Sequence, residues 1–323
     1  GSRSPALGAV FCSQTLAATS TIRLMIQPSS DYVELRAANS ILVVSPAAGG
    51  SITRFASTHD GSTVEWLRPA LPNAVASRSG GSASSFPMVP FSNRIQNGTF
   101  AFNGRTIQLP QDFRPEPHAI HGHAWRASWN VVGRSDNTLT IDYRHSVGAW
   151  PWPYRAQQSF TLTATHLRVR FAVTNESSRP MPLGFGLHPY FIRTPQVRLR
   201  ASVDRMWRVD KTAIPDALVT PPPDLTFTAG GLNPDASILD NNFIGFDGRA
   251  SLEWPEWNAR LDVTADPIYS CLVIYTPESQ NFFCVEPATN CIDAFNLANQ
   301  GRTDTGLIVL EPQDTAAGDV TFA

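Results

Sequence analysis

The stretch SFTLTATHLRVRFAVTNESSRP, residues 159–180, decides the predicted fold. Apolar and polar residues alternate along SFTLTA (159–164) and again along LRVRFAVT (167–174), and this period of two is typical of a strand with one buried face. The cluster TNESSRP (174–180) that follows is rich in turn-forming residues. The stretch therefore predicts two strands with short, hairpin-like connections.

The same alternation recurs along the chain, which contains 26 prolines and 21 glycines and hardly a segment with helical periodicity over three turns. The further predicted strands are ILVVS (41–45), TFAF (99–102), LTIDY (139–143), ARLDVTA (259–265) and CLVIYT (271–276). Turn signals lie between them at Asn97-Gly98, Asn103-Gly104, GRSDN (133–137) and Asp247-Gly248. We predict a mainly β protein, built as a large antiparallel β-sandwich.

No low-complexity linker interrupts residues 29–323, so we predict a single sandwich domain over residues 25–323. PPPD (221–224) is interpreted as a surface loop because strand-like sequence of the same character resumes beyond it. Residues 1–24 contain one early arginine and a short, interrupted apolar patch. We expect them to be a leader, tag or extension outside the fold.

The charge pattern argues against nucleic acid and membrane as partners. The formal net charge is −2 and the basic residues are scattered singly, so no basic stripe could neutralise a phosphate backbone. The sequence contains no run of 18 apolar residues. Lys211 is the single lysine, which makes Schiff-base chemistry an unfavourable hypothesis.

Four cysteines, Cys12, Cys271, Cys284 and Cys291, occur without a CxxC pair. Free cysteine packs as a small hydrophobic residue, and the last three lie in sequence typical of buried strands. We therefore expect core thiols and a reducing, cytoplasmic location.

Polar residues with catalytic potential are embedded in four apolar segments: FPMVPFSNRI (86–95), HAIHGHAW (118–125), PLGFGLHPYF (182–191) and CVEP (284–287). A single buried histidine or glutamate is more often structural. His188 and Glu286 together are more informative, because an imidazole and a carboxylate, with ordinary pKa values near ~6.5 and ~4.3, form a natural acid and base pair.

The motif HAIHGH also suggests a metal site. His121 and His123 are two residues apart, would share one face of a strand and could both bind a cation, as in a cupin. The next residues, AWRASW (124–129), contain no carboxylate to complete such a site. We predict no metal and leave the roles of His118 and His123 open.

These segments, in this order, resemble the aldose 1-epimerase (galactose mutarotase) family over most of the chain. The matching motifs are Asn93-Arg94-Ile95, His121-Gly122, His188-Pro189-Tyr190-Phe191, Asp240-Asn241-Asn242-Phe243 and Glu286-Pro287. The resemblance implies a galactose mutarotase-like supersandwich with a sugar groove across one sheet. His123 departs from the family's usual second glycine, and His118 departs from a frequent asparagine.

By this resemblance the chain interconverts the α and β anomers of a free or modified aldose without a cofactor. Glu286 would remove the proton of the O1 hydroxyl, and His188 would protonate the ring oxygen. The substrate contacts would come from Arg94, His121, Asp240, Asn93 and Tyr190. The implied partner is a small sugar, and the oligomeric state, monomer or homodimer, stays open.

Two other functions remain as alternatives. A non-catalytic carbohydrate-binding protein on the same scaffold would keep Arg94 and Asp240 but could lose Glu286 or His188. A glycoside hydrolase would need two carboxylates flanking the scissile bond, and a polysaccharide lyase is the remaining enzyme class.

The sequence leaves the sugar undefined among hexoses, pentoses, and phosphorylated or sulfonated sugars. An anionic sugar would need a further arginine near the groove, for which the candidates are Arg114, Arg126, Arg155 and Arg193. A stacking wall for the sugar could come from Trp150, Trp152, Trp254 and Trp257.

Overall fold

The computed structural model describes residues 31–59, 61–77, 80–111, 113, 115–223, 225, 227 and 230–323, so the expectation for residues 1–24 and Cys12 lies outside the described residues. Antiparallel strands dominate this part of the chain. Its helical elements are short: α1 (Ala294–Asn299) and the 3-10 turns η1 (Gly80–Ser82), η2 (Gln96–Gly98), η3 (Ala124–Arg126) and η4 (Pro255–Trp257). None of the helices in the described ranges is long and apolar enough to cross a membrane.

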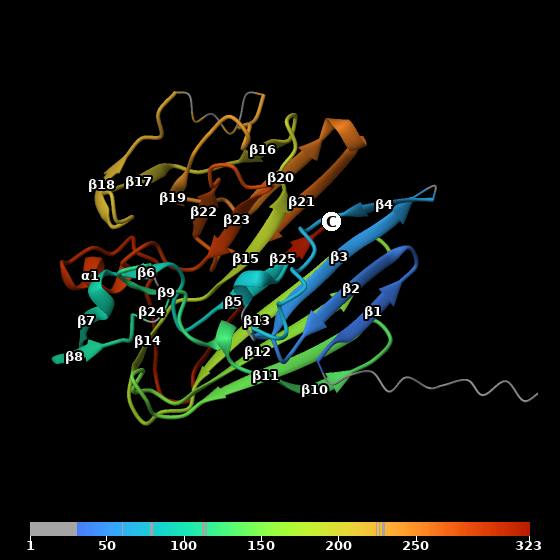
Figure 1. Cartoon of the computed structure of the whole chain (residues 1–323). Helices are drawn as coiled ribbons and strands as arrows, with labels where there is room; N and C mark the ends of the chain where they lie inside the picture. Colours follow the sequence, from blue (N-terminus) through green and yellow to red (C-terminus); the bar gives the residue numbers. More distant parts are fainter. Residues whose placement is uncertain are drawn as a thin grey trace, which may run out of the picture.

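The larger sheet contains eleven strands within the described residues (Figure 1). Its spatial order is β1 (Val33–Ala37), β2 (Ser40–Ser45), β3 (Ser51–His59), β5 (Ser85–Met88), β15 (Gly186–Ile192), β23 (Phe282–Ala288), β22 (Cys271–Tyr275), β19 (Asp240–Ile244), β17 (Arg205–Val209) and β18 (Pro215–Val219), with β4 (Ser62–Glu65) paired to β3. Every pairing in it is antiparallel.

The second sheet, of eight strands, has the order β10 (Asn130–Arg134), β11 (Thr138–His145), β12 (Tyr154–Leu162), β13 (Leu167–Asn175), β25 (Thr315–Phe322), β21 (Ala259–Ala265), β20 (Arg249–Trp254) and β16 (Arg198–Ala201). Three short pairs complete the described strands: β6 (Arg94–Ile95) with β9 (Ala119–Ile120), β7 (Thr99–Phe102) with β8 (Arg105–Gln108), and β14 (Met181–Leu183) with β24 (Ile308–Leu310). The predicted hairpin in residues 159–180 is confirmed, because β12 and β13 pair from Tyr154↔Asn175 to Leu162↔Leu167.

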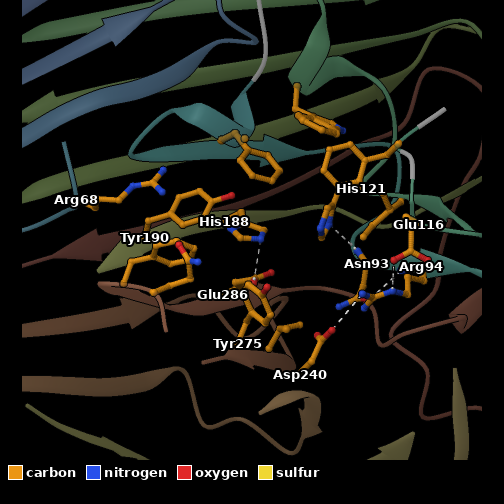
Figure 2. A pocket seen from close by; sticks show the side chains of 18 of the residues that line it. Arg68, Asn93, Arg94, Glu116, His121, His188, Tyr190, Asp240, Tyr275 and Glu286 are labelled. Carbon is orange, nitrogen blue, oxygen red and sulfur yellow. Dashed lines mark hydrogen bonds and ion pairs between the residues drawn. The ribbon is translucent and has the colours of Figure 1, made fainter. Parts of the chain in front are cut away.

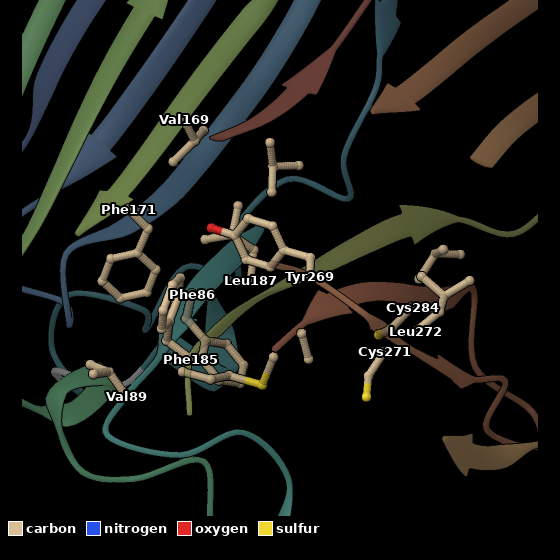
Figure 3. Close-up of a cluster of buried hydrophobic side chains, with 14 of the residues drawn as sticks. Phe86, Val89, Val169, Phe171, Phe185, Leu187, Tyr269, Cys271, Leu272 and Cys284 are labelled. Atoms are coloured by element: carbon tan, nitrogen blue, oxygen red, sulfur yellow. The ribbon is translucent and has the colours of Figure 1, made fainter. Parts of the chain in front are cut away.

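The two large sheets pack against each other through one hydrophobic core. Phe55 of β3 meets Phe322 of β25 with ring centroids 6.3 Å apart. Phe185 packs edge-on against both Phe171 and Tyr269 in the same core (Figure 3). The predicted antiparallel sandwich is therefore confirmed. The expectation of core thiols is confirmed for the three described cysteines, which are buried and free: Cys271, Cys284 and Cys291.

The register of the larger sheet determines which polar side chains meet. Residues opposite each other in an antiparallel pair project on the same face. The pairs Gly186↔Ala288 and Tyr190↔Cys284 place His188 of β15 opposite Glu286 of β23. Their strand neighbours Leu187 and Val285 belong to the core. Because side chains alternate along a strand, His188 and Glu286 project from the other face of the sheet, away from that core.

Candidate active site

A cavity of about 410 Å³ lies over this face of the larger sheet, under the loops that carry β6 and β9 (Figure 2). All seven residues that the sequence nominated line it, although they come from five separate stretches of the chain: Asn93, Arg94, His121, His188, Tyr190, Asp240 and Glu286. The structure thus brings together every predicted catalytic and sugar-contacting residue.

His188 and Glu286 are in direct contact at the floor of the cavity. The Nε2 atom of His188 lies 3.2 Å from Oε1 of Glu286. The side chains are almost fully enclosed, and Phe86 stacks on the imidazole with ring centroids 4.4 Å apart. Nδ1 of His188 and Oε2 of Glu286 have no hydrogen-bond partner among the described residues. Both atoms are enclosed by protein, so the described polar contact of the pair is the one between Nε2 and Oε1.

Burial acts on the two groups in opposite directions. Desolvation raises the pKa of Glu286 well above its ordinary value, and the nearby charge of Asp240 adds to the rise while Arg94 opposes it. Desolvation, with a smaller effect of the Arg68 charge, lowers the pKa of His188 to about 3. Both shifts disfavour the charged forms. Between the two shifted pKa values the pair therefore holds one shared proton, which the 3.2 Å contact allows to pass between Oε1 and Nε2.

Arg94 is held rigidly beside this pair by two carboxylates. Its Nε donates to Glu116 at 2.9 Å, and its NH2 group donates to Asp240 at 3.1 Å. The Asn93 side-chain oxygen accepts a hydrogen bond from the Arg94 backbone N–H at 2.9 Å. Glu116, which the sequence analysis missed, therefore serves to orient Arg94, and Asp240 keeps a partly exposed oxygen edge toward the cavity.

The protonation state of His121 follows from its hydrogen bonds. The backbone N–H of Asn93 donates to Nδ1 of His121 at 3.1 Å, so Nδ1 is an acceptor and the proton resides on Nε2. Burial, with smaller effects from His188 and Arg94, lowers the pKa of His121 well below 6.5. His121 is therefore a neutral imidazole whose Nε2–H can donate into the cavity.

The expectation that His121 and His123 share one strand face is wrong. The strand β9 ends at Ile120, and both His121 (φ +58°) and Gly122 (φ +68°) adopt left-handed backbone conformations that turn the chain. His123 consequently points away from the cavity and lies 2.9 Å from the hydroxyl of Tyr154.

A different group of possible ligand atoms lies at the floor of the cavity. One atom each from His188, Glu286 and Cys284 lie within 4.8 Å of one another. Burial raises the pKa of the Cys284 thiol well above its ordinary value, and the charge of Glu286 raises it further. A thiol, in contrast to a thiolate, is a poor metal ligand, so this donor set fits proton chemistry better than metal binding.

His118 lies outside the cavity. It is buried, and its Nδ1 accepts a hydrogen bond from the backbone N–H of Asn97 at 3.0 Å. Its role is thus to fix the turn that follows Arg94 in the chain.

The predicted stacking wall is wrong. Trp150, Trp152 and Trp254 are buried in the core, and Trp257 is partly exposed but lies outside the cavity. The aromatic walls come from residues that the sequence did not single out: Phe86, Phe113, Trp125, Tyr275 and Phe282.

Three of the four suggested arginines also lie outside the cavity. Arg155 pairs with Asp142 at 2.9 Å, Arg126 and Arg193 do not line the cavity, and Arg114 falls outside the described residues. Among the described residues, the second cavity arginine is Arg68, which lies in WLRP after β4. The sequence around Arg68 shows no strand periodicity, so the pattern gave no reason to select this residue.

A family model described as aldose 1-epimerase matches residues 31–322, which is nearly the whole described chain. The chain belongs to the aldose 1-epimerase family. The match covers all five motifs on which the resemblance rested.

Individual relatives agree with this membership. YphB of Escherichia coli (strain K12), a protein of uncharacterized function, is 30% identical over 268 residues, which cover 80% of this chain and 89% of YphB. A solved structure from Escherichia coli K12, provisionally named an aldose 1-epimerase, superposes with a TM-score of 0.80 at 29% identity and covers 90% of this chain and 97% of its own. A galactose mutarotase-like protein from Clostridium acetobutylicum has the same fold, with a TM-score of 0.80 at 21% identity over 90% of this chain and 94% of its own.

Proposed function

We propose that this protein is an aldose 1-epimerase that interconverts the α and β anomers of a free aldose by opening and closing the sugar ring. The observation that carries the proposal is the His188–Glu286 contact, in which two buried proton-exchanging groups share one cavity floor. Membership of the aldose 1-epimerase family supports it. A protein that only bound sugar would have no need for such a pair.

The proposed chemistry moves one proton in each direction. When the shared proton resides on His188, Glu286 is a carboxylate that takes the proton of the O1 hydroxyl, and the imidazolium gives its proton to the ring oxygen. The C1–ring oxygen bond then breaks and C1 becomes an aldehyde carbon. After rotation about the C1–C2 bond, the reverse transfers close the ring on the other face. Ring closure returns one proton to O1 from Glu286 and one to His188 from the ring hydroxyl, so it restores the starting protonation state of both residues.

Neighbouring residues would stabilise the charge that develops on the sugar oxygens. The Nε2–H of neutral His121 and the guanidinium of Arg94 are donors that line the cavity beside the pair. Donors held in place before the reaction stabilise a developing oxyanion more effectively than water does. Asp240 would accept hydrogen bonds from ring hydroxyls.

The test is a panel of freshly dissolved single-anomer sugars, including hexoses and pentoses, followed by polarimetry or NMR. We expect equilibration faster than the spontaneous rate for at least one aldose. Binding of a sugar without any acceleration, across the whole panel, would favour the non-catalytic alternative.

A further inference from the structure

Arg68 is a buried cation whose charge no described carboxylate neutralises. It is 9% exposed, and the described ion pairs do not include it. One NH2 group donates to the Ala83 carbonyl at 2.6 Å, while Nε has no acceptor among the described residues. Burial lowers its pKa, as expected for a cation without a full counter-charge.

Aromatic rings hold the Arg68 guanidinium at one end of the cavity. Its central carbon lies 4.2 Å from the ring centroid of Tyr190 and 4.8 Å from that of Phe282. These contacts stabilise a cation but leave its hydrogen-bonding capacity unfilled, since a guanidinium has five N–H donors. Arg68 is therefore held in place as in a preformed anion-binding site, and it is not part of a structural ion pair among the described residues.

The other cationic group of the cavity, Arg94, is already neutralised. Glu116 and Asp240 both pair with it. A negatively charged group on a ligand would be repelled from that end by the nearest carboxylates. The same group would be attracted to Arg68, so charge alone orients an anionic ligand along the cavity.

The sheet order relates this orientation to the sugar ring. From β15 the strands run through β23 and β22 to β19, so His188, Glu286 and Asp240 follow one another in that direction. Arg68 lies on the opposite side of the pair, where its backbone N–H donates to the Tyr190 carbonyl at 2.7 Å (Figure 2). In a pyranose, C1 is bonded to C2, which carries a hydroxyl, and the ring oxygen is bonded to C5, which carries a further substituent. The C2 hydroxyl and the C5 substituent therefore lie on opposite sides of the C1–ring oxygen bond.

This inference rests on the proposed function. With the ring oxygen at His188, O1 at Glu286 and the C2 and C3 hydroxyls toward Asp240, the C5 substituent extends toward Tyr190 and Arg68. From this geometry we infer that the preferred substrates are aldoses with an anionic group on the C5 substituent, a carboxylate or a phosphoryl group, which Arg68 binds. Arg68 is thus the residue that determines substrate class.

The experiment compares catalysed anomer exchange by NMR for glucuronate and galacturonate, for glucose 6-phosphate, and for neutral glucose and galactose. The variants are Arg68→Met, Arg68→Lys and, as a matched control, Arg193→Met. Arg193 also donates to a backbone carbonyl, that of Pro277 at 2.8 Å, and also has an unpartnered Nε, but it lies outside the cavity.

We expect kcat/KM of the wild type to be at least tenfold higher for an anionic aldose than for its neutral parent. Arg68→Met should reduce that ratio by about 10- to 100-fold, mainly through KM, because it removes a hydrogen bond between charged groups. Arg68→Lys should retain part of the preference, and Arg193→Met should retain all of it. Comparing kcat/KM for the uronates with kcat/KM for glucose 6-phosphate shows whether Arg68 prefers a carboxylate or a phosphoryl group.

Equal or better exchange of the neutral sugars by the wild type would overturn the inference and leave the proposed function intact. So would an unchanged ratio in a folded Arg68→Met variant. If Arg68→Met does not fold, the wild-type ratio and Arg68→Lys decide the question. If no sugar is exchanged, the proposed function is contradicted, and an NMR titration of uronate against glucose binding still tests Arg68.

Discussion

At the scale of single residues, the central feature is that His188 and Glu286 share a proton in a place that disfavours charge. In water a glutamate is ionised at neutral pH and a histidine is half-protonated near pH ~6.5. In the cavity both groups are pushed toward their neutral forms by burial. The pair is consequently a coupled unit, whose apparent pKa values belong to both residues together.

The pH dependence of catalysis follows from this coupling. The pKa of His188 is lowered to about 3, and that of Glu286 is raised. The pair gains a second proton only in strong acid, and it loses its shared proton only when the pH passes the raised value. We expect NMR exchange rates not to fall as the pH decreases from 7 to 5, and to fall on the alkaline side of the raised value.

His188→Asn is the companion variant. It should lower the rate about 10²-fold or more, because an amide cannot accept or release the proton. A wild-type rate that falls as the pH decreases from 7 to 5 would contradict this account, because a pair with these shifts does not gain its second proton in that range.

At the scale of elements, the turn between β9 and η3 positions the catalytic cavity. Gly122 has φ +68° and forms a bridge with Val89. A Cβ atom at Gly122 would lie 2.0 Å from the Val89 carbonyl oxygen, which is backbone and has little freedom to move. The neighbouring His121 depends on this close approach for its direction into the cavity.

Gly122→Ala should therefore be costly, and Gly104 provides a matched control. Gly104 also has a left-handed φ, +73°, in the β7–β8 hairpin, but nothing lies within 4 Å of its would-be Cβ. Urea unfolding should show a loss of about 1 to 2 kcal/mol for Gly104→Ala, from backbone strain alone, and about 3 kcal/mol or more for Gly122→Ala. Similar losses in the two variants would show that the backbone contact is not limiting.

Period-two alternation predicted the strands with one solvated face most clearly, whereas β22, buried on both faces, was predicted from the apolar run CLVIYT. Alternation identified TFAF and ARLDVTA with the bounds of β7 and β21. The strands that carry His188 and Glu286 are covered by loops on one side and by the core on the other, so almost every residue in them is buried. Family resemblance, and not periodicity, nominated His188 and Glu286 as the candidate catalytic residues.

The missed features depend on long-range or backbone geometry. Glu116 meets Arg94 because loops fold over the sheet, and Arg68 occupies a connection without periodicity. The separation of His121 from His123 arises from two consecutive left-handed residues, of which a histidine is one. A sequence pattern gives no signal for these contacts.

At the scale of the whole molecule, buried histidines connect the site to acid stability. Burial, with smaller effects of His145 and Arg126, lowers the pKa of His123 to about 3, and the pKa values of His121 and His188 are also lowered. Between pH ~6.5 and these values the unfolded chain binds more protons than the folded protein. The free energy of unfolding should therefore decrease as the pH falls below ~6.5.

The expected slope is at most about 1.4 kcal/mol per pH unit for each such histidine. Glu286 and Asp293 act with the opposite sign, since their raised pKa values give stability that is lost as the pH rises, but these two carboxyls oppose four histidines, because the pKa of His145 is lowered as well. Urea unfolding from pH 7 to pH 5 measures the slope of the unfolding free energy against pH. The variant His123→Gln, outside the cavity, should reduce this slope by about the contribution of one histidine. A stability that rises on acidification would be inconsistent with these buried neutral imidazoles.

The central claim is that the His188–Glu286 pair catalyses anomer exchange. Its most direct test is saturation-transfer NMR on the anomeric protons of an aldose whose exchange the wild type accelerates. The proteins compared are the wild type, Glu286→Gln and Glu278→Gln. Glu278 is an exposed glutamate in the turn between β22 and β23 and serves as the matched control. We predict exchange with wild type and Glu278→Gln, and only the spontaneous rate with a folded Glu286→Gln protein, because an amide cannot take the O1 proton. Near-wild-type exchange by Glu286→Gln would contradict the account.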